Sequence, residues 1–152
     1  MILILFLLSQ VANASTPGIS VSAPGAFTEV SATGSTTTTS ATDAVMNTMT
    51  ITPTPGDYLV RFSTWCSHST ASATINFSIY NNGVQKTDSV RTIRPFPPGG
   101  GATGGTAAAT INVEAKINGI VTVTTGAVAI EWNTSAATAT CTQRTLDLVR
   151  LK

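Results

Sequence analysis

The most reactive side chains of this sequence stand together in Trp65-Cys66-Ser67-His68-Ser69. A histidine beside serine or cysteine is typical of hydrolases, which need a nucleophile, a base and a carboxylate that orients the base. This chain has one histidine, and nothing in the sequence connects it to such a carboxylate. We therefore expect His68 to be a solvated loop residue, and we expect no catalytic residues.

The carboxylates give no support for catalysis either. Glycoside hydrolysis needs two of them on opposite sides of the scissile bond, and here they are scattered singly. They are Glu29, Asp43, Asp57, Asp88, Glu114, Glu131 and Asp147. The glycine-rich run Gly99–Gly105 lacks the Lys-Ser/Thr ending and the following helix of a phosphate-binding loop. The sequence therefore predicts a protein that is not an enzyme and holds no cofactor.

Cys66 and Cys141 are the two cysteines of the chain. Neither belongs to a CxxC pair, and a single histidine leaves too few ligands for a zinc site, so we expect no metal. Two interpretations of the cysteines stay open. They form a structural disulfide between distant strands, or they are buried free thiols that pack as small apolar side chains.

The composition limits the class of protein. Charged residues make up 10% of the 152 residues, and the net charge is +1 without a basic block. This pattern argues against binding to nucleic acid or to an anionic membrane. A hydrophobic content of 42% is too high for a disordered chain, and the length fits one domain with one core. The abundance of Thr, Ser, Ala and Gly suits a β-protein outside the cytoplasm or in a packed assembly.

Strands must position the residues named above. The clearest strand pattern in the sequence lies in Ile51–Gln85. Tyr58–Trp65 and Thr74–Tyr80 alternate in side-chain character, and Asn82-Gly83 predicts a type I′ hairpin turn. In Tyr58–Trp65 both faces carry bulky side chains. This suits a strand with one face in the core and the other against a second layer or subunit.

Further strands are expected on both sides of this stretch. They are Ala44–Ile51, Val84–Lys86, Asp88–Ile93, Ala107–Ile117, Ile120–Thr124, Ala127–Asn133 and Ala137–Leu151. Turns are predicted at Asn118-Gly119 and Thr125-Gly126, and loops at Cys66–Ala73 and Arg94–Thr106. No segment favours a helix. About eight short strands separated by turn signals predict an all-β protein, an antiparallel β-sandwich of jelly-roll topology.

The beginning of the chain has a different character. Met1–Leu8 is purely apolar, and Ala12-Asn13-Ala14 matches the cleavage pattern of a secretory signal, although no Lys or Arg precedes it. Met1–Ala14 is therefore either a cleaved signal or a retained anchor that inserts into a partner or packs between subunits. Ser15–Thr42 reads as an extended linker in which Phe27–Val30 could form a short strand. We expect an arm over residues 1–42 and a head domain over 43–152.

Four motifs in this head occur in a characteristic order. They are Gly56-Asp57-Tyr58, Asn82-Gly83, Ile130-Glu131-Trp132 and Arg144-Thr145-Leu146-Asp147-Leu148. In the order of these motifs, residues 44–151 resemble the jelly-roll heads of the tumour-necrosis-factor and complement globular-head superfamily. They look most like modules of this type in bacteriophage virion proteins.

The resemblance implies a homotrimer packed about a three-fold axis by bulky side chains. The residues that would make trimer or core contacts are Tyr58, Phe62, Tyr80, Trp132 and Leu148. It also implies a structural protein at the virion surface, such as a decoration, spike or fibre-tip module, bound to other virion proteins through Met1–Thr42. A host-surface glycan or receptor is a further partner of such modules.

An alternative function is a secreted carbohydrate-binding or adhesion module. Exposed aromatic rings beside polar loops can line a sugar site, and here Trp65, Trp132 and the Asn81-Asn82 turn would supply them. Trp65 could equally be part of the core.

Overall fold

The computed structural model describes residues 23–70, 73–95 and 112–152. Apart from one 3-10 turn, η1 (Thr87–Ser89), these residues contain only strands and connections. The strands are β1 (Phe27–Ala32), β2 (Thr36–Thr38), β3 (Ala44–Ile51), β4 (Gly56–His68), β5 (Ile75–Asn81), β6 (Val84–Gln85), β7 (Arg91–Ile93), β8 (Val113–Val123), β9 (Val128–Thr134) and β10 (Ala139–Arg150).

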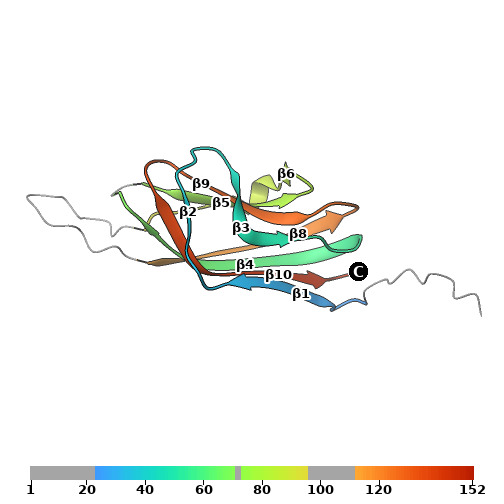
Figure 1. Ribbon diagram of the computed structural model, residues 1–152. Coiled ribbons are helices and arrows are strands. Elements are labelled where there is room, and N and C mark those ends of the chain that lie inside the picture. The colour runs from blue at the N-terminus through green and yellow to red at the C-terminus, as the bar shows by residue number, and fades with distance from the viewer. Residues whose placement is uncertain (1–22, 71–72, 96–111) are drawn as a thin grey trace, which may run out of the picture.

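The strands form two antiparallel sheets that pack face to face (Figure 1). Sheet A has the order β1-β10-β4-β8, with β2 also paired to β10. Sheet B has the order β3-β9-β5-β6, with β7 also paired to β5. The predicted all-β antiparallel sandwich is therefore confirmed.

The pairing is nested along the chain, as in a long hairpin that has been rolled up. β1 pairs with β10, β3 with β9, β4 with β8, and β5 with β6 and β7. The roll closes where β10 meets β4 and β9 meets β5. This is the jelly-roll topology. It has ten strands where about eight were expected, because β2 is an additional short strand and β6 and β7 share one edge of β5.

Alternation along each strand places one set of side chains between the sheets. In β4 the inward residues are Tyr58, Val60, Phe62, Thr64, Cys66 and His68, all of which are buried. β3, β5, β8, β9 and β10 add the rest of the core, including Phe77, Ile117, Trp132 and Leu148. The hydrophobic effect thus fixes which face of each strand is outward.

One irregularity in β3 changes which of its side chains face the core. The register of β3 shifts between Val45 and Thr50, and Thr48 has a φ of 68°. Met46 and Met49 are consequently both buried, whereas strict alternation would put them on opposite faces. A β-bulge has this effect because it adds one residue to one strand of a pair.

The predicted turn at Asn118-Gly119 is wrong. β8 runs through both residues without a break, and Gly119 pairs with Val60. A Cβ at Gly119 would lie 2.9 Å from Cδ1 of Ile79, so the glycine is explained by close packing between the sheets. The other turn predictions hold, since Asn82, Gly83 and Gly126 have φ values of 51°, 75° and 84°.

The expected arm also differs from the structure. β1 and β2 lie within residues 1–42 and pair with β10, so this part of the stretch belongs to the sandwich. A threonine-rich segment can join a sheet because β-branched side chains suit a pleated surface. Met1–Ala14, the segment interpreted as a cleaved signal or a retained anchor, and the glycine-rich run Gly99–Gly105 lie outside the described residues.

Candidate functional site

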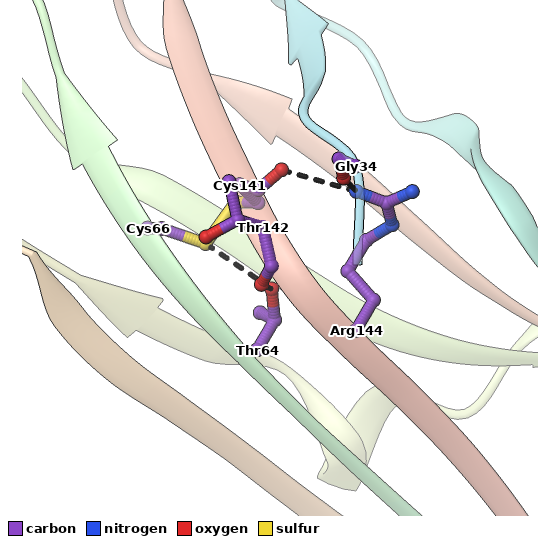
Figure 2. The surroundings of a disulfide bond; sticks show 6 residues. All are labelled: Gly34, Thr64, Cys66, Cys141, Thr142 and Arg144. Atoms are coloured by element: carbon purple, nitrogen blue, oxygen red, sulfur yellow. Dashed lines mark hydrogen bonds between the residues drawn. A yellow bond between two sulfur atoms is a disulfide. The ribbon is translucent and has the colours of Figure 1, made fainter. Parts of the chain in front are cut away.

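β4 and β10 are joined covalently where Cys66 lies opposite Cys141. Their Cα atoms are 4.1 Å apart, and the disulfide links positions separated by 75 residues. Both cysteines are fully buried between the sheets. Beside them, the hydroxyl of Thr64 donates a hydrogen bond of 2.9 Å to the carbonyl of Thr142 (Figure 2). Of the two interpretations left open by the sequence, the structure contains the disulfide.

Arg144 adds a second connection close to this disulfide. The register of β10 shifts between Thr142 and Thr145, which turns Arg144 inward, where it is buried. Its Nη1 donates to the carbonyl of Gly34 at 2.6 Å and to that of Cys141 at 3.1 Å (Figure 2). Burial lowers the pKa of the guanidinium, because desolvation disfavours its charge. The side chain ties the connection between β1 and β2 to β10, which is a structural role.

His68 is buried, so the expectation of a solvated loop residue is wrong. β4 continues two residues past Cys66, and the imidazole points inward. Its Nδ1 accepts a hydrogen bond from the backbone N–H of Thr70 at 2.9 Å. The Nε2 lies 2.7 Å from the hydroxyl of Thr134, and it must carry the proton because Nδ1 is an acceptor. The neutral imidazole therefore links β4 to β9, with no carboxylate among its contacts.

The densest polar network lies on the outer face of sheet B around Asp43. Its Oδ2 accepts from Tyr80 at 2.7 Å, from Gln85 at 3.0 Å and from Ser78 at 3.3 Å. Its Oδ1 accepts from the amide of Asn133 at 2.5 Å. We call these five residues the Asp43 cluster. It joins the start of β3 to β5, β6 and β9.

The Asp43 carboxylate shifts the pKa values of two neighbouring side chains. The hydrogen bond to Asp43 raises the pKa of Tyr80 to about 12, with burial as a smaller cause. Glu131, which pairs with Ser78, has its pKa raised by burial and then by the charge of Asp43. Because the Asp43 carboxylate already accepts four hydrogen bonds, it is poorly suited to act as a base. The cluster fixes sheet B and offers no reactive group.

Side chains that could ligate a metal are not clustered in the described part of the chain. Over residues 23–70, 73–95 and 112–152, no group of three His, Cys, Asp or Glu side chains could hold a metal ion. Within these ranges no helix is long and apolar enough to cross a membrane.

Four of the five residues predicted as trimer or core contacts lie in the core of one chain. Tyr58, Phe62, Trp132 and Leu148 are between 0% and 4% exposed. Phe77 lies between two of them, with ring centroids 6.0 Å from Phe62 and 6.3 Å from Trp132. Tyr80 is the exception, because it points out of sheet B into the Asp43 cluster. A contact between copies must therefore use other side chains than these four.

The residues of the alternative sugar site are not brought together. Trp132 is buried between the sheets, whereas Trp65 is 42% exposed on the outer face of sheet A, so its core interpretation is wrong. The amide of Asn81 donates to the carbonyl of Thr122, which is paired with Asp57. Asp57 and Trp65 are eight residues apart on β4, or about 26 Å at the usual rise of a strand.

Sequence reasoning missed the Asp43 cluster, although a signal was present. The outward positions of β5 and β9 carry amide and hydroxyl side chains, such as Asn76, Tyr80 and Asn133, where charged residues are more usual on a solvated face. Side chains of this kind bond to one another readily. Their convergence on Asp43 could not be foreseen, since it depends on where β3 enters sheet B.

Comparison with known proteins supports the fold. No protein-family model and no curated protein matches the sequence. Among solved structures, the chain is similar to VP2 of the infectious bursal disease virus subviral particle, with a TM-score of 0.50 and 8% identity. The match covers 82% of this chain and 32% of the VP2 chain, so this chain spans about a third of that protein. At this identity the similarity shows a shared β-sandwich fold. The narrower resemblance to tumour-necrosis-factor-like heads stays a prediction.

Proposed function

We propose that this chain is a non-enzymatic structural module of a virus particle, such as a decoration, spike or fibre-tip protein at the virion surface. The observation that carries the proposal is the complete jelly roll of β1 to β10, which has a structural relative in a protein that forms a subviral particle.

Links between distant strands stabilise both sheets of the sandwich. Two links tie β10 to its neighbours across sheet A and to the loop after β1: the Cys66–Cys141 disulfide and the hydrogen bonds of Arg144. The Asp43 cluster does the same on sheet B. A module that must survive outside a cell benefits from such links, because each one restrains strands that are distant in sequence.

Attachment and assembly belong to the proposal as well. We assign attachment to the part of Met1–Thr42 that precedes β1, since β1 and β2 are built into sheet A. The resemblance to virion heads favours a homotrimer. Because four of the five suggested contact residues are core residues, such a trimer would use outward side chains of the sandwich.

Incorporation into particles tests the proposal. The gene product should co-sediment with virus particles, and a chain without Met1–Ser15 should lose this association while keeping the circular dichroism spectrum of the folded head. Association that survives the deletion would contradict the assignment of the attachment segment. A protein that never accompanies particles would contradict the viral role. Specific binding to a glycan array that depends on Trp65 would favour the secreted carbohydrate-binding alternative.

A further inference from the structure

One register line across sheet A carries only apolar side chains on its outer face. Phe27 pairs with Val149, Val149 with Leu59, and Leu59 with Ile120, so the line crosses β1, β10, β4 and β8 in turn. We call these four residues the apolar row. Phe27 and Ile120 at its two ends are 53% and 58% exposed. Four outward apolar side chains in one line differ from the single exposed apolar residues that are common on protein surfaces.

The next register line on this face is polar and has two halves of opposite charge. Glu29 on β1 pairs with Asp147 on β10, Asp147 with Arg61 on β4, and Arg61 with Asn118 on β8. We call these four residues the charged row. Its acidic residues lie on β1 and β10. Its basic residue lies on β4, and Lys116 follows on β8, two residues from Asn118.

These charges are only partly neutralised within the chain. Arg61 and Asp147 are 3.3 Å apart, and the Arg61 side chain remains 48% exposed. Lys116, 64% exposed, pairs with Glu114 of its own strand. None of the ion pairs between described residues involves Glu29, which is exposed. β1 and β10 therefore contribute only acidic side chains to this face, Glu29 and Asp147, whereas β4 and β8 contribute the basic Arg61 and Lys116 together with the acidic Asp57 and Glu114.

We infer that the outer face of sheet A packs against the same face of a second copy, about a two-fold axis parallel to its strands. Such an axis keeps each row opposite itself and reverses the order of the strands. β1 then faces β8 of the second copy, and β10 faces β4. The contact is self-complementary, as two-fold contacts must be.

Both rows fit this arrangement. In the apolar row, Phe27 meets Ile120 of the other copy and Val149 meets Leu59, which removes all four side chains from water. In the charged row, Asp147 comes opposite Arg61 of the second copy. Glu29 comes opposite Asn118 and within reach of Lys116. Glu29 and Asp147 of one face thus lie close to Lys116 and Arg61 of the other.

The area is sufficient for a specific contact of modest strength. Neighbouring strands lie about 4.8 Å apart and rise about 3.3 Å per residue. Four strands with about ten residues each therefore present roughly 600 Å² per copy, or about 1,200 Å² in total, at the lower end of stable interfaces. Figure 1 shows sheet A as one of the two layers of the sandwich. Its outer face points away from sheet B.

This inference goes beyond the viral role and does not depend on it. A two-fold contact gives dimers of an isolated chain, or hexamers if trimers also form. Its signature is that disrupting it halves the mass of the assembly. Loss of particle association would leave this measurement unchanged, so failure of one proposal is distinguishable from failure of the other.

Sedimentation of the purified full chain tests the contact. We expect a mass of at least twice the 15.6 kDa of one chain in a concentration series up to about 100 μM, where micromolar contacts are populated. Phe27→Ser with Ile120→Ser should halve that mass. Val45→Ser with Val84→Ser is the matched control, because these valines of sheet B are 56% and 70% exposed and should leave the mass unchanged. A monomeric wild type, or a mass unaffected by the first pair, would overturn the inference.

Charge reversal tests the orientation. Glu29→Lys should weaken the association about fivefold, because it places a positive charge beside Lys116 of the second copy. Adding Lys116→Glu should restore most of the affinity. Asp88→Lys in η1 controls for the change in net charge and should have no effect. If the second substitution does not rescue the first, the two-fold axis is placed wrongly.

Cross-linking identifies the occupant of the face. A photoreactive phenylalanine analogue at position 120, in a mixture of isotopically light and heavy chains, should give light–heavy cross-links to the segment around Phe27. Cross-links to Met1–Leu8 would show that the apolar start of the chain covers this face, and would overturn the proposed contact. Cross-links within single chains only would overturn it too.

Discussion

The hydroxyl of Tyr80 donates a hydrogen bond of 2.7 Å to Oδ2 of Asp43, across 37 positions of sequence. This contact joins the outer face of β5 to the residue before β3, and it stabilises the neutral phenol. The pKa of Tyr80 is raised to about 12 as a result. The ionisation of the Tyr80 phenol can be followed by its absorbance, so this contact can be measured directly.

We predict that Tyr80 ionises near pH 12. Its folded-state pKa lies above the unfolded value of about 10, so its contribution to stability is present below pH 10 and is lost as the pH rises toward 12. Absorbance at 295 nm should show this late ionisation, and Tyr80→Phe should remove it. Asp43→Asn should return the pKa of Tyr80 toward 10. A transition near pH 10 that is lost in Tyr80→Phe would contradict the prediction.

We predict that Glu131 makes the stability of the protein depend on pH in the acidic range. Burial raises its folded-state pKa, so the stability linked to its protonation is present at low pH and is lost as the pH rises through that pKa. Glu131→Gln should therefore gain stability relative to the wild type between pH 4 and pH 7, as measured by urea unfolding. Glu114→Gln, on the outer face of sheet A, controls for the loss of one negative charge. An advantage of Glu131→Gln that is equal at both pH values would contradict the argument.

The disulfide should be a major source of stability. A link across 75 residues is worth about 4 kcal/mol in the chain-entropy model. Cys66→Ala with Cys141→Ala should lower the melting temperature by about 10 °C, since about 1 kcal/mol corresponds to about 2–4 °C at this size. Calorimetry measures the shift, and a thiol assay on the denatured wild type should find no free cysteine. Two reactive thiols in that assay would show that the bond does not form.

His68 should be a structural residue in its neutral form. Its Nδ1 accepts from Thr70 and its Nε2 donates to Thr134, so the nitrogen NMR shifts should report the Nε2–H tautomer. His68→Ala removes the hydrogen-bond acceptor of the Thr70 N–H and opens a cavity, whereas the hydroxyl of Thr134 keeps its hydrogen bond to the carbonyl of Ala136, and we expect a cost of about 2–4 kcal/mol in chemical unfolding. Ser67→Ala, on the opposite face of β4, is the control and should cost less than about 1 kcal/mol. A solvent-exposed imidazole, or the Nδ1–H tautomer, would contradict this prediction.

The sequence by itself determined the class of fold and most of the strands. Alternation in β4 and β5 identifies the buried face because two-residue periodicity follows directly from backbone geometry. The Asn82-Gly83 hairpin was predictable because a type I′ turn needs positive φ at both residues. These are local properties, and they do not depend on which strands become neighbours.

Only the tertiary structure decided what depends on strand order and register. Gly119 looked like a turn residue, but it lies in a continuous strand where Ile79 of the other sheet approaches closely. His68 and Trp65 looked alike as loop-edge residues, yet one is buried and the other exposed, because β4 continues through His68. The apolar row and the Asp43 cluster gather residues from both ends of the chain. Their members become neighbours only when the nested pairing aligns β1 with β10 and brings β3 beside β9, and no local pattern encodes that alignment.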